Sequence, residues 1–141
     1  MNNPIRRRYG FTLVEVMAVL LIVGLLAGLA IQNFMGQTDR AKQKATEAKL
    51  RMLHQAVNLF KLDTGRYPTE EEGLLALIEQ PSDVENWQPG GYLEKLPKDP
   101  WGRAYRYLNP GLKGEIDVYS TGADGEPGGT GPDADIGSWD D

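Results

Sequence analysis

The residues best suited to chemistry in this 141-residue chain are acidic ones near its end. Residues 117–141 include seven acidic residues and no lysine or arginine. Three of them, Asp124, Asp133 and Asp135, stand among glycines and prolines, which predicts a loop offering carboxylate and carbonyl oxygens. Such hard oxygen ligands suit calcium. The spacing of an EF-hand is absent, so a solvated acidic loop without metal remains the alternative on composition alone.

Other kinds of site find little support in the composition. The chain has no cysteine, which excludes disulfides, thiolate metal sites and cysteine nucleophiles. Its single histidine, His54, lies in an amphipathic stretch, where we expect a packed or exposed side chain. Because no nucleophile, base and orienting acid can be assembled around it, we predict no enzyme activity, and a tethered hydrolase is disfavoured.

Glu15 is the only charged residue in an apolar run that covers residues 11–31. A helix of about 20 apolar residues is long enough to cross a bilayer, so this run predicts a transmembrane helix. The arginines at positions 6–8 should stay in the cytoplasm, which places the chain after Ile31 on the other side of the membrane. A carboxylate inside a bilayer costs about 2.5–3.5 kcal/mol, so Glu15 needs a partner unless it reaches water or is protonated.

The basic and apolar start of the chain fits a transmembrane helix better than it fits a secretory signal peptide or a nucleic-acid-binding segment. A secretory signal peptide has a shorter apolar region followed by a small-residue cleavage site, and cleavage near Ala30 remains the alternative. Nucleic-acid binding is not expected, because the sequence has 15 lysines and arginines but 20 acidic residues. The only basic cluster is the short one at the start.

Residues 10–15, with the sequence GFTLVE, resemble the class III signal of type IV pilins and pseudopilins. The resemblance implies that a prepilin peptidase cuts between Gly10 and Phe11 and methylates the new amino terminus at Phe11, so the apolar helix is retained. Glu15 would then find its partner in the Phe11 amine of a neighbouring subunit, because opposite charges attract strongly at low dielectric. Glu15 is accordingly expected to direct assembly.

The remaining sequence predicts an α+β fold. Apolar residues from Phe34 to Phe60 recur at helical spacing, which predicts one long helix over about residues 11–62. Thr69 predicts the N-cap of a short second helix that ends before Pro81. Residues 104–108 and 115–120 predict two antiparallel strands. The predicted parts are a leader (1–10), the transmembrane half of the long helix (11–31), its periplasmic half (32–62), and a globular head with the calcium-binding loop (63–141).

Three segments of the head, residues 63–77, 90–102 and 120–129, resemble the major pseudopilins of type II secretion systems. The resemblance covers essentially the whole mature chain. It implies a structural subunit of the periplasmic pseudopilus that polymerises through its N-terminal helix and drives export of folded proteins across the outer membrane. The implied partners are further copies of the chain, prepilin peptidase, minor pseudopilins, the inner-membrane assembly platform and the membrane itself.

The same resemblance bears on location and on the metal. It implies a single-pass protein of the bacterial inner membrane with its head in the periplasm. It also implies a calcium site whose ligands are Asp124, Asp133, Asp135 and the carbonyls of Thr121 and Glu126. The alternatives are a minor pseudopilin or type IV pilin, although many pilins carry a disulfide that this chain cannot form, and a membrane-tethered, calcium-dependent periplasmic binding protein.

Overall fold

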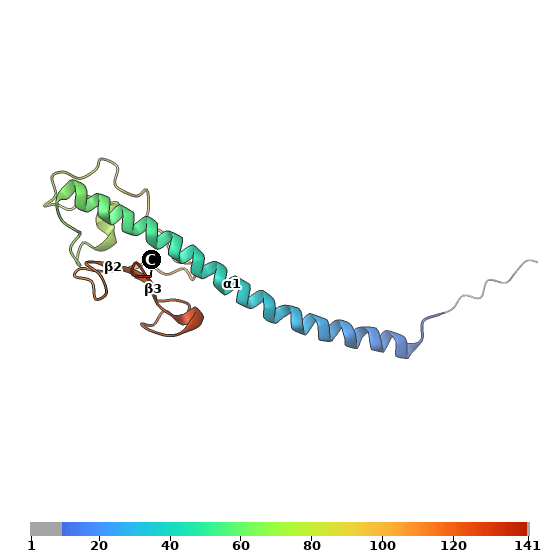
Figure 1. The fold of residues 1–141 in the computed structure, drawn as a ribbon. Coiled ribbons are helices and arrows are strands. Elements are labelled where there is room, and N and C mark those ends of the chain that lie inside the picture. Colours follow the sequence, from blue (N-terminus) through green and yellow to red (C-terminus); the bar gives the residue numbers. More distant parts are fainter. Residues whose placement is uncertain (1–9, 141) are drawn as a thin grey trace, which may run out of the picture. The chain divides into compact units, whose positions relative to one another are not determined.

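The computed structural model describes residues 10–140, without the side chains of residues 30–35. Most of the predicted leader and the last residue therefore lie outside the described residues. The chain forms two compact units, Met1–Thr38 and Asp39–Asp141. Helix α1 (Leu13–Thr64) supplies residues to both units (Figure 1). The predicted long helix is thus present, with its ends shifted by two residues.

The end of α1 follows from local sequence. Gly65 adopts a φ of 80°, and its N–H donates to the carbonyl of Lys61 at 2.8 Å. A glycine in the left-handed region directly after a helix satisfies a carbonyl that the helix leaves free, without the strain that a side chain would bring. Within the described residues, we find no helix long and apolar enough to cross a membrane.

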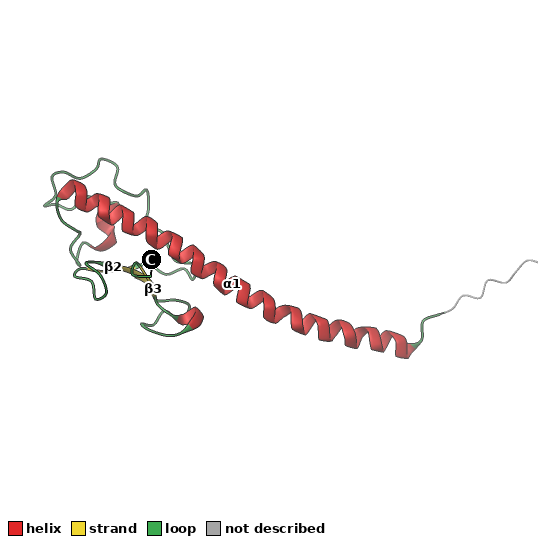
Figure 2. Ribbon diagram, in the orientation of Figure 1, coloured by secondary structure: helices red, strands yellow, loops and turns green. Residues whose placement is uncertain are grey.

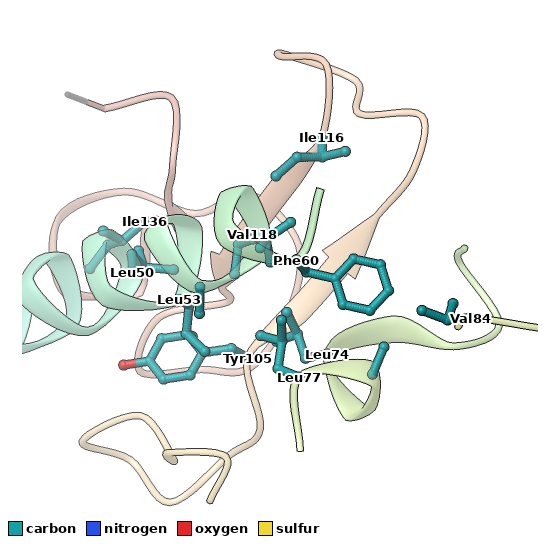
Figure 3. Close-up of a cluster of buried hydrophobic side chains, with 13 residues drawn as sticks. Leu50, Leu53, Phe60, Leu74, Leu77, Val84, Tyr105, Ile116, Val118 and Ile136 are labelled. Atoms are coloured by element: carbon teal, nitrogen blue, oxygen red, sulfur yellow. The ribbon is translucent and has the colours of Figure 1, made fainter. Parts of the chain in front are cut away.

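The hydrophobic core lies in the Asp39–Asp141 unit. One stripe of α1 is buried there, with Leu53, Val57 and Phe60 at 0 % exposure. Figure 3 shows side chains from α1, from the short helix of residues 73–77 and from the sheet pointing toward one another around Phe60 and Val118. Burial of apolar side chains contributes roughly 1.5–3 kcal/mol each, so this cluster is the main source of stability of the unit.

A three-stranded antiparallel sheet packs near this core. Its strands are β1 (Arg106–Leu108), β2 (Asp117–Ser120) and β3 (Ile136–Gly137), in the order β1-β2-β3. Tyr107 pairs with Val118, and Ser120 pairs with Ile136. The two predicted strands are confirmed, although they are shorter than expected, and β3 was not predicted.

Loops make up most of the unit outside α1, as Figure 2 shows, and two buried carboxylates hold them. Asp117, at 1 % exposure, accepts hydrogen bonds from the backbone N–H groups of residues 112, 113 and 114 at 2.7, 3.0 and 2.9 Å. Asp99 accepts from the N–H groups of Trp101 and Arg103 and from the Ser120 hydroxyl. Each carboxylate satisfies several donors at once, which makes its burial tolerable.

The predicted second helix differs in detail from the observed one. Thr69 and Glu72 exchange hydrogen bonds between side chain and backbone, at 2.7 and 3.2 Å, as a capping box does. The regular helix begins only afterwards, as the 3₁₀ helix η1 (Gly73–Leu77). The start near Thr69 was therefore one turn too early. A second 3₁₀ turn, η2 (Gly131–Asp133), lies in the acidic part of the chain.

Candidate functional site

The predicted processing site lies directly before α1. Gly10 and Phe11 are exposed, Phe11 to 85 %. The N–H of Thr12 donates to Oε2 of Glu15 at 3.5 Å, and the N–H of Glu15 donates to the Thr12 hydroxyl at 3.2 Å. These reciprocal contacts form a capping box that satisfies two amide groups at the start of the helix. Glu15 thus has a partner within its own chain, which was not predicted from the sequence.

The apolar side chains after Glu15 are not covered by any residue that the structure describes. Every described side chain from residue 10 to residue 29 is exposed. The large exposed side chains after Glu15 are Val16, Met17, Val19, Leu20, Leu21, Ile22, Val23, Leu25, Leu26 and Leu29. A contiguous apolar surface of this size marks contact with lipid or with other protein chains.

The predicted calcium ligands lie in one loop, residues 121–135, called the acidic loop below. Its path depends on close backbone packing: a Cβ on Gly122, which has a φ of 65°, would approach the carbonyl oxygen of Asp133 to 2.8 Å. The Ala123 N–H donates to the Pro132 carbonyl at 3.0 Å. The two ends of the loop are therefore held side by side by backbone contacts.

The candidate ligands have different surroundings within this loop. Asp124 is exposed, and its Oδ1 accepts from the N–H of Glu126 at 3.0 Å. Asp133 is also exposed. The carbonyl of Thr121 accepts a hydrogen bond from the N–H of Gly125 at 3.2 Å. Asp135 is half-buried; its Oδ2 accepts from the Gly128 N–H at 2.9 Å.

The carboxylate and carbonyl oxygens of the acidic loop are of the type that binds a cation, although its acidic side chains do not converge on one point. Among residues 10–140, no three acidic or histidine side chains converge as they would around a metal ion. Within that same range, Oδ1 of Asp135 is a buried carboxylate oxygen without a hydrogen-bond partner. A buried, unsatisfied carboxylate oxygen is unfavourable, and a cation is one way to satisfy it.

Two contacts to the acidic loop were missed by sequence reasoning. The Arg103 guanidinium donates from Nη1 to the Gly122 carbonyl at 2.8 Å and from Nη2 to the Ala123 carbonyl at 3.0 Å. Gln43, on α1, donates from Nε2 to the Gly131 carbonyl at 3.0 Å. Neither contact has a local sequence signal, because its partners lie far apart in the chain. Thr12 could have been identified, since its spacing from Glu15 is the capping-box signature.

His54 lines a surface pocket of about 350 Å³ together with Tyr67, Lys113, Glu115 and Trp139. It is half-buried, as expected for a packed side chain, and its Nδ1 has no hydrogen-bond partner among the described residues. Lys113 lies 4.4 Å from the centre of the Trp139 ring. Ser138 also lines this pocket, and its hydroxyl oxygen accepts a hydrogen bond from the Val118 N–H at 3.2 Å.

An exposed apolar helix with a capping acid at its start, joined to a small α+β unit, places the chain in the class of pilin-like proteins. Residues 33–139 match the family model of "Type II secretion system (T2SS), protein G", and residues 5–31 match the "Prokaryotic N-terminal methylation motif". The chain belongs to the family of type II secretion system protein G. The expected family and a structural, non-enzymatic role are thereby confirmed.

Similar proteins support this assignment over nearly the full length. "Type II secretion system core protein G" of Vibrio cholerae is 46 % identical, over 97 % of this chain and 95 % of that protein. The protein of the same description from Pseudomonas aeruginosa is also 46 % identical, over 96 % and 97 %. A crystal structure of the major pseudopilin of the type 2 secretion system of enterohaemorrhagic Escherichia coli superposes with a TM-score of 0.67, at 41 % identity, over 76 % of this chain and 94 % of that one. The α+β fold is thus confirmed.

Proposed function

We propose that the chain is the structural subunit of a periplasmic pseudopilus. As a member of its family it works with the other components of a type II secretion system. Residues 11–31 anchor it once in the inner membrane, and the rest of the chain lies in the periplasm. A prepilin peptidase removes residues 1–10. Copies then polymerise through their N-terminal helices, with minor pseudopilins and the assembly platform, to drive export of folded proteins across the outer membrane.

One observation supports this proposal above the others: the exposed apolar surface begins with Phe11, directly after the Gly10–Phe11 bond, and continues along α1 from Leu13. Cleavage at that bond creates a cation at Phe11 next to the start of this surface. The match of residues 5–31 to the N-terminal methylation motif supports processing at the same place. An anchor that served only as a tether would need no such junction.

The contacts of Glu15 suggest how it takes part in assembly. Within the part of the chain that the structure describes, its carboxylate accepts one hydrogen bond, the long, 3.5 Å contact from the Thr12 N–H. A charged amine on a neighbouring copy attracts a carboxylate much more strongly in a low-dielectric environment. We therefore infer that Glu15 exchanges its own backbone partner for the Phe11 amine of another subunit as the filament forms.

Intact mass spectrometry of the protein from its native membrane tests the processing step. We expect the loss of residues 1–10 and the gain of one methyl group. Glu15→Ala should be processed identically and yet fail to form filaments, whereas Glu15→Asp should retain part of the assembly. A retained leader, or a cut near Ala30, would contradict the proposal, and so would normal filaments from Glu15→Ala.

We also propose that the acidic loop binds calcium. Asp124, Asp133 and Asp135 would supply carboxylate ligands, and the carbonyls of Thr121 and Glu126 would supply neutral ones. The partnerless Oδ1 of Asp135 supports this assignment. Calcium would neutralise acids that repel one another and so order the loop.

Thermal unfolding of the purified full chain in detergent tests the calcium site. Calcium at about 100 times its dissociation constant should raise the free energy of unfolding by about 2.7 kcal/mol relative to EDTA. Magnesium should have little effect, since it prefers a smaller octahedral site. Asp135→Asn should remove most of the calcium response, while Glu94→Gln, an exposed change elsewhere, should preserve it. Equal melting temperatures in calcium and EDTA would refute the site.

A further inference from the structure

The guanidinium of Arg103 contacts the acidic loop. Residues 117–141 contain no lysine or arginine, so any internal cation for the loop must come from elsewhere in the chain. Arg103 supplies one, with its two terminal nitrogens on the consecutive carbonyls of Gly122 and Ala123 at 2.8 and 3.0 Å. Two parallel charge-assisted hydrogen bonds fix the orientation of both peptide groups.

The turn is shaped to receive this guanidinium. Gly125 has a φ of 80°, and a Cβ at this position would lie 2.6 Å from Nε of Arg103. Any side chain here would displace the guanidinium. The Gly125 N–H in turn donates to the Thr121 carbonyl at 3.2 Å, which closes the turn around the arginine.

The backbone of Arg103 is itself held firmly. Its N–H donates to Oδ1 of the buried Asp99 at 2.8 Å, and its carbonyl accepts from the Asp99 N–H at 2.8 Å. The other carboxylate oxygen of Asp99 accepts from the hydroxyl of Ser120, the last residue of β2, at 2.8 Å. The guanidinium therefore projects from a fixed support next to the point where the acidic loop begins.

We propose that Arg103 is a built-in cation of the acidic loop that holds its 121–125 turn closed before calcium arrives. Its role in calcium binding rests on the calcium site proposed above, whereas its role in the calcium-free loop does not. Because the turn is already ordered, calcium binding need order only the remainder of the loop, and a pre-ordered site binds more tightly. Removing the guanidinium should loosen the free loop and weaken calcium binding by roughly tenfold.

Hydrogen exchange of the full chain in detergent and EDTA tests the calcium-free role. The variants are Arg103→Met, which keeps the stem of the side chain, and Arg103→Lys, which keeps the charge without the fork. Arg106→Ala removes an exposed arginine on the neighbouring strand and is the matched control. We expect exchange in residues 121–126 to rise at least tenfold in Arg103→Met, less in Arg103→Lys, and not in the control.

Exchange in the buried part of α1, residues 50–60, reports the state of the core in the same experiment. If core and loop exchange rise together, Arg103 is a general structural residue and the proposal is wrong. Unchanged loop exchange in Arg103→Met would also overturn it. A general loss of structure is thus distinguished from a local release of the loop.

Calorimetric titration with calcium tests the second role. Weaker binding by Arg103→Met, with normal binding by Arg106→Ala, is the expected result. Tighter binding would mean that the guanidinium repels calcium, and this would overturn the proposed pre-ordering. If the unmodified chain itself binds no calcium, the calcium site fails, while the exchange experiment still decides whether Arg103 holds the turn.

Discussion

Arg66, just after the end of α1, joins three segments through its guanidinium. Nη1 and Nη2 each donate to a carboxylate oxygen of Glu72 at 2.8 Å. Nη2 also contacts Asp83 at 2.9 Å, and Nη1 donates to the Tyr67 carbonyl at 3.1 Å. The hydrogen bonds from Arg66 lower the pKa of Glu72 to about 2, from 4.5. One partly buried arginine thus connects the helix end to η1 and to the turn beyond it.

Glu72→Gln should destabilise the Asp39–Asp141 unit in a pH-dependent manner. The change removes the charge from two hydrogen bonds, which should lower the free energy of unfolding at pH 7 by about 1.5–3 kcal/mol. Because the folded pKa of Glu72 lies below its unfolded value, this stabilisation is complete above about pH 4.5 and is lost as the pH falls toward 2. Urea unfolding at pH 7, 4 and 2.5 measures the decline.

The adjacent Glu71→Gln is the control for this experiment, since Glu71 is exposed. It should change the free energy of unfolding by no more than about 0.5 kcal/mol at any of these pH values. A pH-independent loss in Glu72→Gln would show that packing, and not charge, explains its effect.

Single residues were predictable where their partners are near in sequence. Thr69 does form a capping box with the glutamate three positions later, although the 3₁₀ helix begins only at Gly73 and so the predicted start at Thr69 was too early. The partners of Arg66 and Arg103 were not predictable, because they depend on where distant loops return. For the same reason, the sequence identified the acids of the candidate calcium loop but not the arginine that contacts it.

At the level of elements, the second half of α1 depends on its buried stripe. Leu53→Ala should lower the free energy of unfolding by about 2–5 kcal/mol, because Leu53 is fully buried and its truncation leaves a cavity. Leu59, on the same helix, is 50 % exposed, and Leu59→Ala should cost about 1 kcal/mol or less. Chemical denaturation of the two variants gives the comparison. Equal losses would mean that burial in the core does not determine the cost of the truncation.

The helix was predicted well and the strands less well, for physical reasons. Apolar spacing in α1 repeats over many turns, so errors affect only its ends. Ala104 was assigned to the first strand, yet it pairs with Lys98 in an isolated bridge instead of with β2. Strand β3 has two residues, Ile136 and Gly137, too few for an alternating pattern to be detected.

At the scale of the whole molecule, the division into two units has a direct consequence for stability. The core residues, from Leu50 to Ile136, all belong to the Asp39–Asp141 unit. A fragment of residues 39–141 should therefore be soluble and unfold in one cooperative transition. Circular dichroism and urea titration would test this. Leu53→Ala should lose the same free energy of unfolding in the fragment as in the full chain, and a fragment without a cooperative transition would contradict the prediction.

The sequence predicted both the apolar run and the α+β architecture, because each depends on periodicity or composition over many residues. It could not predict the boundary between the units at Thr38 and Asp39, since α1 continues through it without a break. Such a boundary reflects where contacts from distant segments begin, for example the hydrogen bond from Gln43 to the Gly131 carbonyl. Those contacts exist only once the chain has folded.

The position of β3 near the end of the sequence determines when the sheet can be completed during synthesis. It is the last of the three strands to leave the ribosome, and it contributes Ile136 to the core. The sheet cannot be completed while β3 is still being made. The apolar segment of residues 11–31 is made well before β3, so it leaves the ribosome before the sheet is complete. Translation therefore exposes the apolar segment at a time when the core still lacks Ile136 and the sheet cannot yet close.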